Sequence, residues 1–173
     1  MKRKILVFIL ATAIAVTMTG CGAAAWEEYT STDGSFSVQM PGTPVEETDS
    51  LDTVVGNIDI YAFSVENSDA AYAVVYSDYP QSMIDQSNVQ DMLDDACSGA
   101  VEGAQGSMNS QTSITYSSYP GREINLTTSN DTIITQRMYV VGNRLYQLLI
   151  ETEAGDASSS NVAKFLDSFE LVQ

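Results

Sequence analysis

Cys21 is the residue with the clearest chemical role, because of the segment that precedes it. The chain begins with the basic residues Lys2 to Lys4 and continues with an apolar stretch from Ile5 to Met18. This stretch is shorter than the roughly 20 residues that a membrane-spanning helix needs, and small residues follow it. A cleaved export signal has these features, so we predict that residues 1–20 are removed and that Cys21 becomes the first residue of the exported chain.

The segment Met18-Thr19-Gly20-Cys21 resembles the lipobox of bacterial lipoproteins. In those proteins the cysteine is diacylated on sulfur, the signal is cut before it, and the new amino group is often acylated as well. The resemblance implies lipidation of Cys21, with palmitate-type chains, and a lipid anchor on the extracytoplasmic side of the cell membrane, or in the outer membrane of a two-membrane envelope. Residues 21–25 would then form a tether that reaches only about 15 Å.

Other nucleophilic chemistry has little support in the sequence. The chain has no histidine, which excludes Ser-His-Asp and Cys-His catalysis and most zinc sites. If Cys21 carries lipid, Cys97 has no partner for a disulfide, and Asp94 and Asp95 would raise the pKa of its thiol. We interpret Cys97 as a small buried residue, with a reactive thiol as the alternative, and predict a non-catalytic protein without a cofactor.

Carboxylates gather at two places where a cation could bind. Asp91, Asp94 and Asp95 fall on a predicted helix, with Asp91 and Asp95 one turn apart, where like charges repel. The second group surrounds Gly155 and consists of Glu151, Glu153 and Asp156. A weak Ca²⁺ site is conceivable, but neither place has an EF-hand-like loop, so we favour solvated surfaces and predict no metal site.

Tyrosines and arginines provide weaker signals. Tyr29, Tyr79 and Tyr119 fall at predicted strand ends or turns, where they could line a protein-binding face; half-buried tyrosines of a sheet are the alternative. Arg122 and Arg137 lie in predicted strands of a chain with few cations. Each should therefore bind a specific carboxylate.

Length and charge limit the class of protein. Removing 20 of the 173 residues leaves 153, which suits a single domain over 26–173. The net charge of −16 becomes −19, because three of the seven basic residues lie in the signal and 23 carboxylates remain. Such a surface repels phosphate backbones, so nucleic acid is excluded as a partner. Solubility explains the acidity, with attraction of cations as the alternative.

The elements that must position these residues follow from hydrophobic periodicity. The acidic stretch 46–52 is predicted to be a loop. A change of apolar phase beyond Ile60 predicts either a bulge near Tyr61 or burial of both strand faces there. We predict strands over 26–30, 35–40, 53–66, 71–77, 113–117, 121–127, 132–141 and 144–151.

Two helices complete the prediction. The first is amphipathic, is N-capped by Ser87 and ends between Gly103 and Gly106; the second starts near Ser159 or Ser160. Its expected core stripe is Val162, Phe165, Leu166 and Phe169. Gly142-Asn143 is expected to be a two-residue hairpin loop. Together these elements predict an α+β fold with a central antiparallel, meander-rich sheet of about six to eight strands, flanked by two helices.

Four motifs stand out along the predicted domain: FSVQMPGTP at 36–44, YPGRE at 119–123, RMY at 137–139 with GNRLY at 142–146, and FLDSF at 165–169. Together they resemble uncharacterised bacterial lipoproteins with a PsbP-like or DcrB-like domain. The resemblance implies an antiparallel sheet flanked by helices. The function we predict is a lipid-anchored accessory or protein-binding module of the cell envelope whose partner is another envelope protein. The alternative is a carrier of a small ligand or cation.

Overall fold

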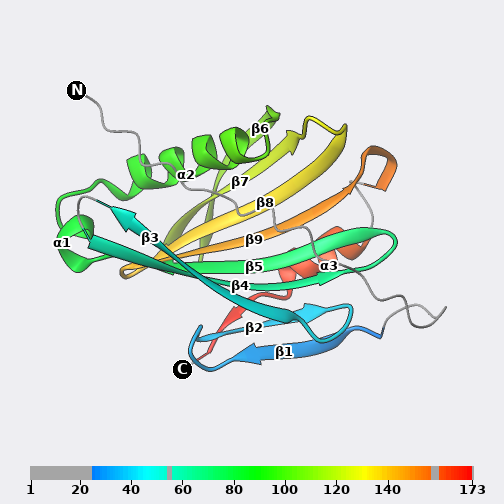
Figure 1. Ribbon diagram of the computed structural model, residues 1–173, viewed down its shortest axis with the longest axis horizontal. Helices are drawn as coiled ribbons and strands as arrows, with labels where there is room; N and C mark the ends of the chain where they lie inside the picture. Colours follow the sequence, from blue (N-terminus) through cyan, green and yellow to red (C-terminus); the bar gives the residue numbers. More distant parts are fainter. Residues whose placement is uncertain (1–24, 54–55, 157–159, 173) are drawn as a thin grey trace.

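The computed structural model describes residues 25–53, 56–156 and 160–172 (Figure 1). Its strands and helices follow the chain as β1 (Glu27–Ser31), β2 (Phe36–Met40), β3 (Val45–Thr53), β4 (Gly56–Glu66), β5 (Ala70–Asp78), α1 (Gln81–Ile84), α2 (Val89–Gly103), β6 (Ser107–Tyr116), β7 (Tyr119–Thr127), β8 (Thr132–Val141), β9 (Arg144–Glu153), the 3-10 turn η1 (Ala154–Asp156), α3 (Ser160–Asp167) and β10 (Glu170–Leu171). The predicted α+β fold is confirmed.

The strands form two antiparallel sheets. The central sheet has seven strands in the order β3-β4-β5-β9-β8-β7-β6, and a smaller sheet has the order β1-β2-β10. The smaller sheet was not predicted, because strand periodicity does not reveal which partner a strand pairs with. It forms when β10, after the last helix, pairs Glu170 with Ser37 and Leu171 with Phe36.

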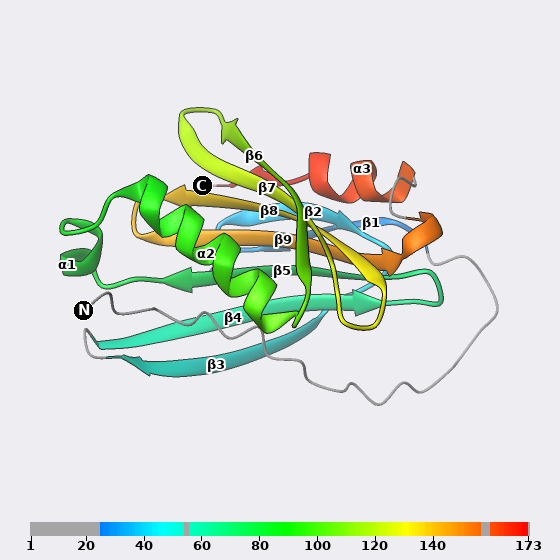
Figure 2. The same ribbon diagram turned by 90° about the horizontal axis from the view of Figure 1, so that it is seen from above.

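The central sheet is the middle layer of the domain. Helix α2 lies on one face, and the smaller sheet and α3 lie on the other (Figures 1 and 2). Successive side chains of a strand point to opposite faces, so Leu145 faces α2 whereas Tyr146 faces the smaller sheet. Both faces are therefore buried in the middle of the sheet.

The face under the smaller sheet is aromatic. We call it the aromatic face, and its buried rings belong to Phe36, Phe63, Tyr72, Tyr76, Tyr139, Tyr146, Phe165 and Phe169. The opposite side, here the α2 face, buries small and aliphatic residues, among them Leu93, Ala96 and Ala100 of the helix. The amphipathic pattern predicted for the helix is confirmed, because these residues recur at three- and four-residue spacing on one side.

The predicted loop at 46–52 is wrong, because these residues belong to β3. This strand pairs along its length with β4, from Val45 opposite Ser64 to Thr53 opposite Gly56. It is an edge strand with mostly exposed side chains, so carboxylates such as Asp49 and Asp52 extend into solvent while the backbone makes the ladder. Charged side chains on an edge also discourage pairing with another chain.

The phase change in β4 is explained by burial on both faces and not by a bulge. The register with β3 and β5 is continuous through Tyr61. Ile58 is buried on the α2 face and Phe63 on the aromatic face, so the strand contributes to a different core at each end. A register irregularity occurs instead in β6, between Met108 and Ser110, and this strand begins six residues before the predicted 113.

The boundaries of the two predicted helices agree with the structure except at one cap, and the short helix α1 was not predicted. Asn88 rather than Ser87 caps α2, and its side-chain oxygen accepts a hydrogen bond of 2.8 Å from the Gln90 N–H. The last helix begins at Ser160 among the described residues, and Phe169 of its expected stripe is buried beyond the end of the helix. The Gly142-Asn143 loop is present, with Gly142 at a φ of 63°.

Candidate functional site

A pocket of about 260 Å³ opens where α1 and the start of α2 meet the turn between β8 and β9. Its floor is apolar and consists of Tyr79, Met83, Met92, Ala96, Val140 and Leu145. Its rim is polar and consists of Gln86, Ser87, Asn88, Asp91 and Asp95. An apolar cavity with a few polar groups at its mouth is the usual form of a small binding site.

Tyr79 is the polar group at the base of this pocket. The residue is only 7% exposed, and within the described ranges its hydroxyl makes no hydrogen bond to the protein, but the hydroxyl oxygen is open to the pocket. Burial raises the pKa of Tyr79 to about 12. The phenol is therefore neutral at physiological pH and can donate or accept a hydrogen bond to a group that enters the pocket.

Asp91 and Asp95 give the rim its negative charge. Both side chains are exposed and lie one turn apart on α2. The third member of the predicted acidic group, Asp94, points elsewhere and accepts hydrogen bonds from Arg122 Nε at 2.9 Å and from Gln111 at 2.9 Å. Of the three carboxylates, Asp94 therefore forms an ion pair with the sheet, whereas Asp91 and Asp95 lie at the pocket.

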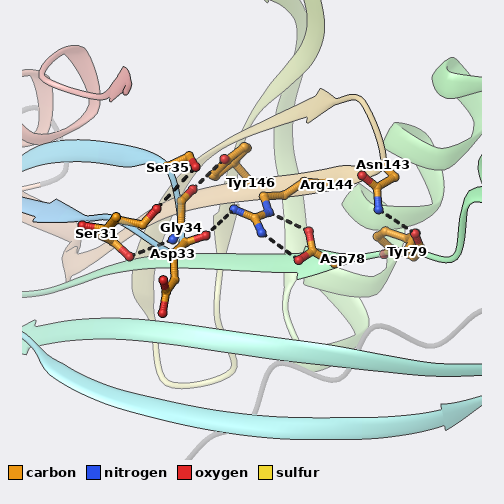
Figure 3. A network of polar contacts seen from close by, with 10 residues as sticks. Ser31, Asp33, Gly34, Ser35, Asp78, Tyr79, Asn143, Arg144 and Tyr146 are labelled. Carbon is orange, nitrogen blue, oxygen red and sulfur yellow. Dashed lines mark hydrogen bonds and ion pairs between the residues drawn. The ribbon is translucent and has the colours of Figure 1, made fainter. Parts of the chain in front are cut away.

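Reciprocal hydrogen bonds hold the wall formed by Tyr79 and the hairpin turn. The Tyr79 N–H donates to the Asn143 carbonyl at 2.9 Å, and the Asn143 side-chain amide donates to the Tyr79 carbonyl at 3.0 Å. Figure 3 shows this pair beside a second contact, in which Arg144 binds Asp78. Arg144 Nε and Nη2 donate to the two carboxylate oxygens of Asp78 at 2.6 and 2.7 Å.

The same arginine connects the two sheets. Arg144 Nη1 donates to the Asp33 carbonyl at 2.9 Å, and the Tyr146 hydroxyl donates to the Gly34 carbonyl at 2.7 Å (Figure 3). A side chain at position 34 would clash, because its Cβ would lie 2.6 Å from the Phe36 ring. The turn between β1 and β2 is thus fixed against the start of β9, next to the hairpin that bounds the pocket.

Several predicted residues have the partners that were expected. Arg122 binds Asp94, and Arg137 binds Glu123 and Asp167 at 2.6 Å each. Arg137 Nη1 also donates to the Leu166 carbonyl at 3.1 Å and so ties the end of α3 to the sheet. Both arginines are structural, as predicted.

The three tyrosines do not form one binding face. Tyr29 belongs to β1 and donates to Glu46 at 2.6 Å, and Tyr119 starts β7 and is half-buried. Tyr79 does not contribute to an exposed binding face, because α1 and the hairpin turn cover it. Of the three, only Tyr79 lines the pocket.

Cys97 is 1% exposed on the inner side of α2. Burial, together with the nearby Asp94 carboxylate, raises the pKa of its thiol to about 11. The interpretation as a small buried residue is confirmed. Cys21, the predicted lipidation site, lies outside the described residues together with the signal and most of the tether.

The remaining acidic group does not converge on a site. Glu151 accepts a hydrogen bond of 2.5 Å from Thr132, whereas Asp156 is exposed in η1. Across the described part of the chain, no three acidic or cysteine side chains are placed to hold a metal ion. Within the same ranges, no helix has the length and apolar content needed to cross a bilayer.

Sequence reasoning missed the hairpin side of the pocket. Arg144 and Asp78 are 66 residues apart along the chain, and only the pairing of β5 with β9 places them opposite each other. The signal available in the sequence was the small number of basic residues, which had already suggested a specific carboxylate partner for Arg122 and Arg137. The same reasoning applied to Arg144 would have predicted an ion pair.

Comparison with known proteins gives a fold. No family model and no curated protein matches the sequence. The structure is similar to the solution structure of cyanobacterial PsbP (CyanoP) from Synechocystis sp. PCC 6803, with a TM-score of 0.58 and 11% identity over 90% of this chain and 98% of that chain. A protein of unknown function from Pseudomonas aeruginosa gives a TM-score of 0.42 at 11% identity over 80% of this chain and 90% of its own. The similarity to CyanoP shows that this chain has a PsbP-like fold.

Proposed function

We propose that this protein is a lipid-anchored, extracytoplasmic binding module that serves another component of the cell envelope and catalyses no reaction itself. The anchor follows from the export signal and Cys21. The observation that carries the binding role is the position of the pocket, which lies at the end of the domain opposite the predicted anchor.

Trp26 marks the anchor end. It lies five residues after Cys21, so a tether of about 15 Å would keep it near the membrane surface. Its ring packs edge-on against Tyr72 at 5.5 Å, and Lys164 Nζ lies 4.4 Å from its centroid. The first described residues are thereby held against the start of β5 and against α3.

The pocket lies beyond the other end of β5. Tyr72 and Tyr79 are seven residues apart along this strand and its continuation, which corresponds to about 23 Å at 3.3 Å per residue. Figure 1 shows α1 and the start of α2 at one end of the sheet and the start of β1 at the other. With lipid on Cys21, the pocket would face away from the membrane, where a partner can reach it.

The residues present favour binding over catalysis. The chain has no histidine, and its one described cysteine is buried with a raised pKa. The carboxylates at the pocket are exposed, and an exposed carboxylate is a weak general base near neutral pH. A polar rim on an apolar floor suits recognition. The pocket also supports the second candidate, a carrier of a small ligand.

Replacing Cys21 tests the anchor. In Cys21→Ser cells we expect the protein to leave the membrane fraction or to remain as the uncleaved precursor, because two acyl chains contribute about 0.8 kcal/mol per buried CH₂ and their loss abolishes stable attachment. Cys97→Ala is the matched control, since it removes the other cysteine and should leave the mass of the attached lipid unchanged. A Cys21→Ser protein that stays in the membrane fraction and carries the same lipid mass as the wild type would refute the anchor.

Cross-linking of the lipidated protein in its native membrane, followed by mass spectrometry, tests the partner. A reproducible envelope protein cross-linked near α1, the start of α2 or the β8–β9 turn would support the binding module. Cross-links confined to the Trp26 end would contradict the proposed orientation. An empty pull-down combined with ligand binding would favour the carrier.

A further inference from the structure

We propose that the pocket binds an alkylammonium or alkylguanidinium group, with the cation between Asp91 and Asp95 and the alkyl part on the apolar floor. This inference deepens the proposed function, since it assigns a ligand chemistry to the same pocket. It does not depend on the lipid anchor. A lysine or arginine side chain of a partner and a free organic amine share this chemistry.

Within the part of the chain that the structure describes, no cation neutralises the negative charge at the rim. Asp91 and Asp95 are both exposed, and like charges at this spacing disfavour the helix. Among the described residues, no basic side chain lines the pocket. The nearest arginines along the adjoining elements are occupied, because Arg122 binds Asp94 and Arg144 binds Asp78. A cation at the rim would therefore replace a repulsion with an attraction.

Tyr79 provides an observation independent of the carboxylates. It is a polar side chain more than nine-tenths buried, it lines the pocket, and its hydroxyl has no partner among the described residues. Among the described residues, Gln136 Oε1 is the buried side-chain atom without a partner, so the Tyr79 hydroxyl oxygen is open to the pocket and can bond a group that enters it. The Tyr79 ring adds surface to the floor, on which the alkyl part of the ligand can pack.

The floor selects against simple ions. Met83, Met92, Val140 and Leu145 offer apolar surface, whereas Ca²⁺ requires six to eight oxygen ligands. An anion is disfavoured as well, because Asn88 caps the first turn of α2 and Asp91 lies within that turn. A cation that carries an alkyl chain matches both the rim and the floor.

Methionine methyl groups allow a direct test in the full-length lipidated protein. We would label the methionines with ¹³C at the methyl group, hold the protein in a non-ionic detergent and titrate n-butylguanidinium and n-butylammonium. The Met83 and Met92 signals should shift with saturation, while Met40 and Met138, both 0% exposed in the cores, should not. n-Butanol is the neutral control and should bind at least about fivefold more weakly.

Variants then locate the cation. Asp91→Asn with Asp95→Asn should weaken n-butylguanidinium binding about 5- to 10-fold, because the charge attraction is lost while the helix and floor remain. Asp156→Asn, an exposed carboxylate on η1, is the matched control and should change nothing. Tyr79→Phe keeps the ring and should weaken binding about twofold or more through loss of the hydroxyl. Unchanged Met40 and Met138 signals would show that each variant is folded.

Equal shifts with n-butanol and n-butylguanidinium, or full affinity in the double Asp variant, would overturn the proposal even if the anchor is established. Nα-acetyl-lysine N-methylamide distinguishes the two sources of the cation. Binding as tight as that of n-butylammonium supports a side chain of a partner protein as the natural occupant. Binding of the free amine alone supports a soluble organic cation.

Discussion

The two faces of the central sheet are buried by different means. The aromatic face is covered by three strands and α3, and its rings touch one another: Phe36 lies 5.4 Å from Phe63 and 6.0 Å from Phe169, measured between ring centroids. The α2 face is covered by one helix that approaches through small residues such as Ala96 and Ala100. Because one helix is too narrow to cover seven strands, part of this face stays open. The pocket lies in such an opening, at the N-terminal end of α2.

Polar burial separates the faces as well. On the α2 face, Gln136 is 0% exposed and donates to Gln147 at 2.8 Å, while its own side-chain oxygen has no partner within the described ranges. On the aromatic face, the Tyr146 hydroxyl is satisfied by the Gly34 carbonyl. The aromatic face therefore holds the framework together, whereas the α2 face tolerates openings in which a ligand can bind.

Truncation of one residue on each face should give the largest contrast. We expect Phe36→Ala to lower the free energy of unfolding by about 4 kcal/mol, because it empties a site surrounded by rings. Met92→Ala should cost only about 1 kcal/mol, because Met92 borders a pocket already open to solvent. Urea denaturation of both variants measures the difference. Similar losses of unfolding free energy would contradict the distinction between the two faces.

The titration of the buried Cys97 thiol shows whether solvent is excluded from the part of the α2 face that lies outside the pocket. The thiol has a pKa of about 11 when folded and about 9 when unfolded, so between these values only the folded state keeps the proton. The contribution of this thiol to the free energy of unfolding is therefore fully present below about pH 9. It should fall by about 2 kcal/mol as the pH rises toward 11. Urea midpoints measured across this range detect the fall.

Cys97→Ala is the control for this pH dependence. Without the thiol, the decline between about pH 9 and 10 should be lost, whereas above about pH 10 both proteins should lose stability, because burial raises the pKa of Tyr79 from about 10 to about 12. Native wild-type protein should also resist thiol reagents at neutral pH until it unfolds. Rapid labelling under native conditions would show that the helix does not seal this face.

Arg144 joins the two sheets beside the pocket, so its replacement measures how much the link between the sheets contributes to stability. Arg144→Met should lower stability by about 1 to 2 kcal/mol, because it removes two charge-assisted bonds to Asp78 and one to the Asp33 carbonyl. Asp78→Asn should lower the free energy of unfolding less in the Arg144→Met variant than in the wild type, and a double-mutant cycle measures this difference. Full additivity would mean that the pair makes no joint contribution.

Local periodicity predicted most elements because it reports which side of an element is apolar. In β2, Phe36, Val38 and Met40 alternate, and all three are buried; along α2, the apolar residues define the packed side. The prediction failed at β3, whose acidic residues have no apolar face to reveal a strand. Whether such a segment pairs depends on β4 beside it, and pairing between strands leaves no local pattern.

The candidate site was only partly foreseeable. The charge repulsion between Asp91 and Asp95 is a property of helical spacing and was recognised in the sequence. That Asp94 turns to Arg122, and that Tyr79 becomes the base of a pocket, follow from contacts between segments far apart in the chain. Tyr79 was misjudged because its neighbours in the sequence indicate a turn, whereas Val140 and Leu145 bury it from another hairpin.

The prediction of an export signal that ends at Cys21, the excess of carboxylates, the absence of histidine and the apolar periodicity of strands and helices can all be read from local order or composition. Only the tertiary structure decided that the strands divide into two sheets and that a pocket lies opposite the start of the domain. Long-range pairing made those choices: β9 next to β5 brings Asn143 to Tyr79, and no local spacing specifies that contact.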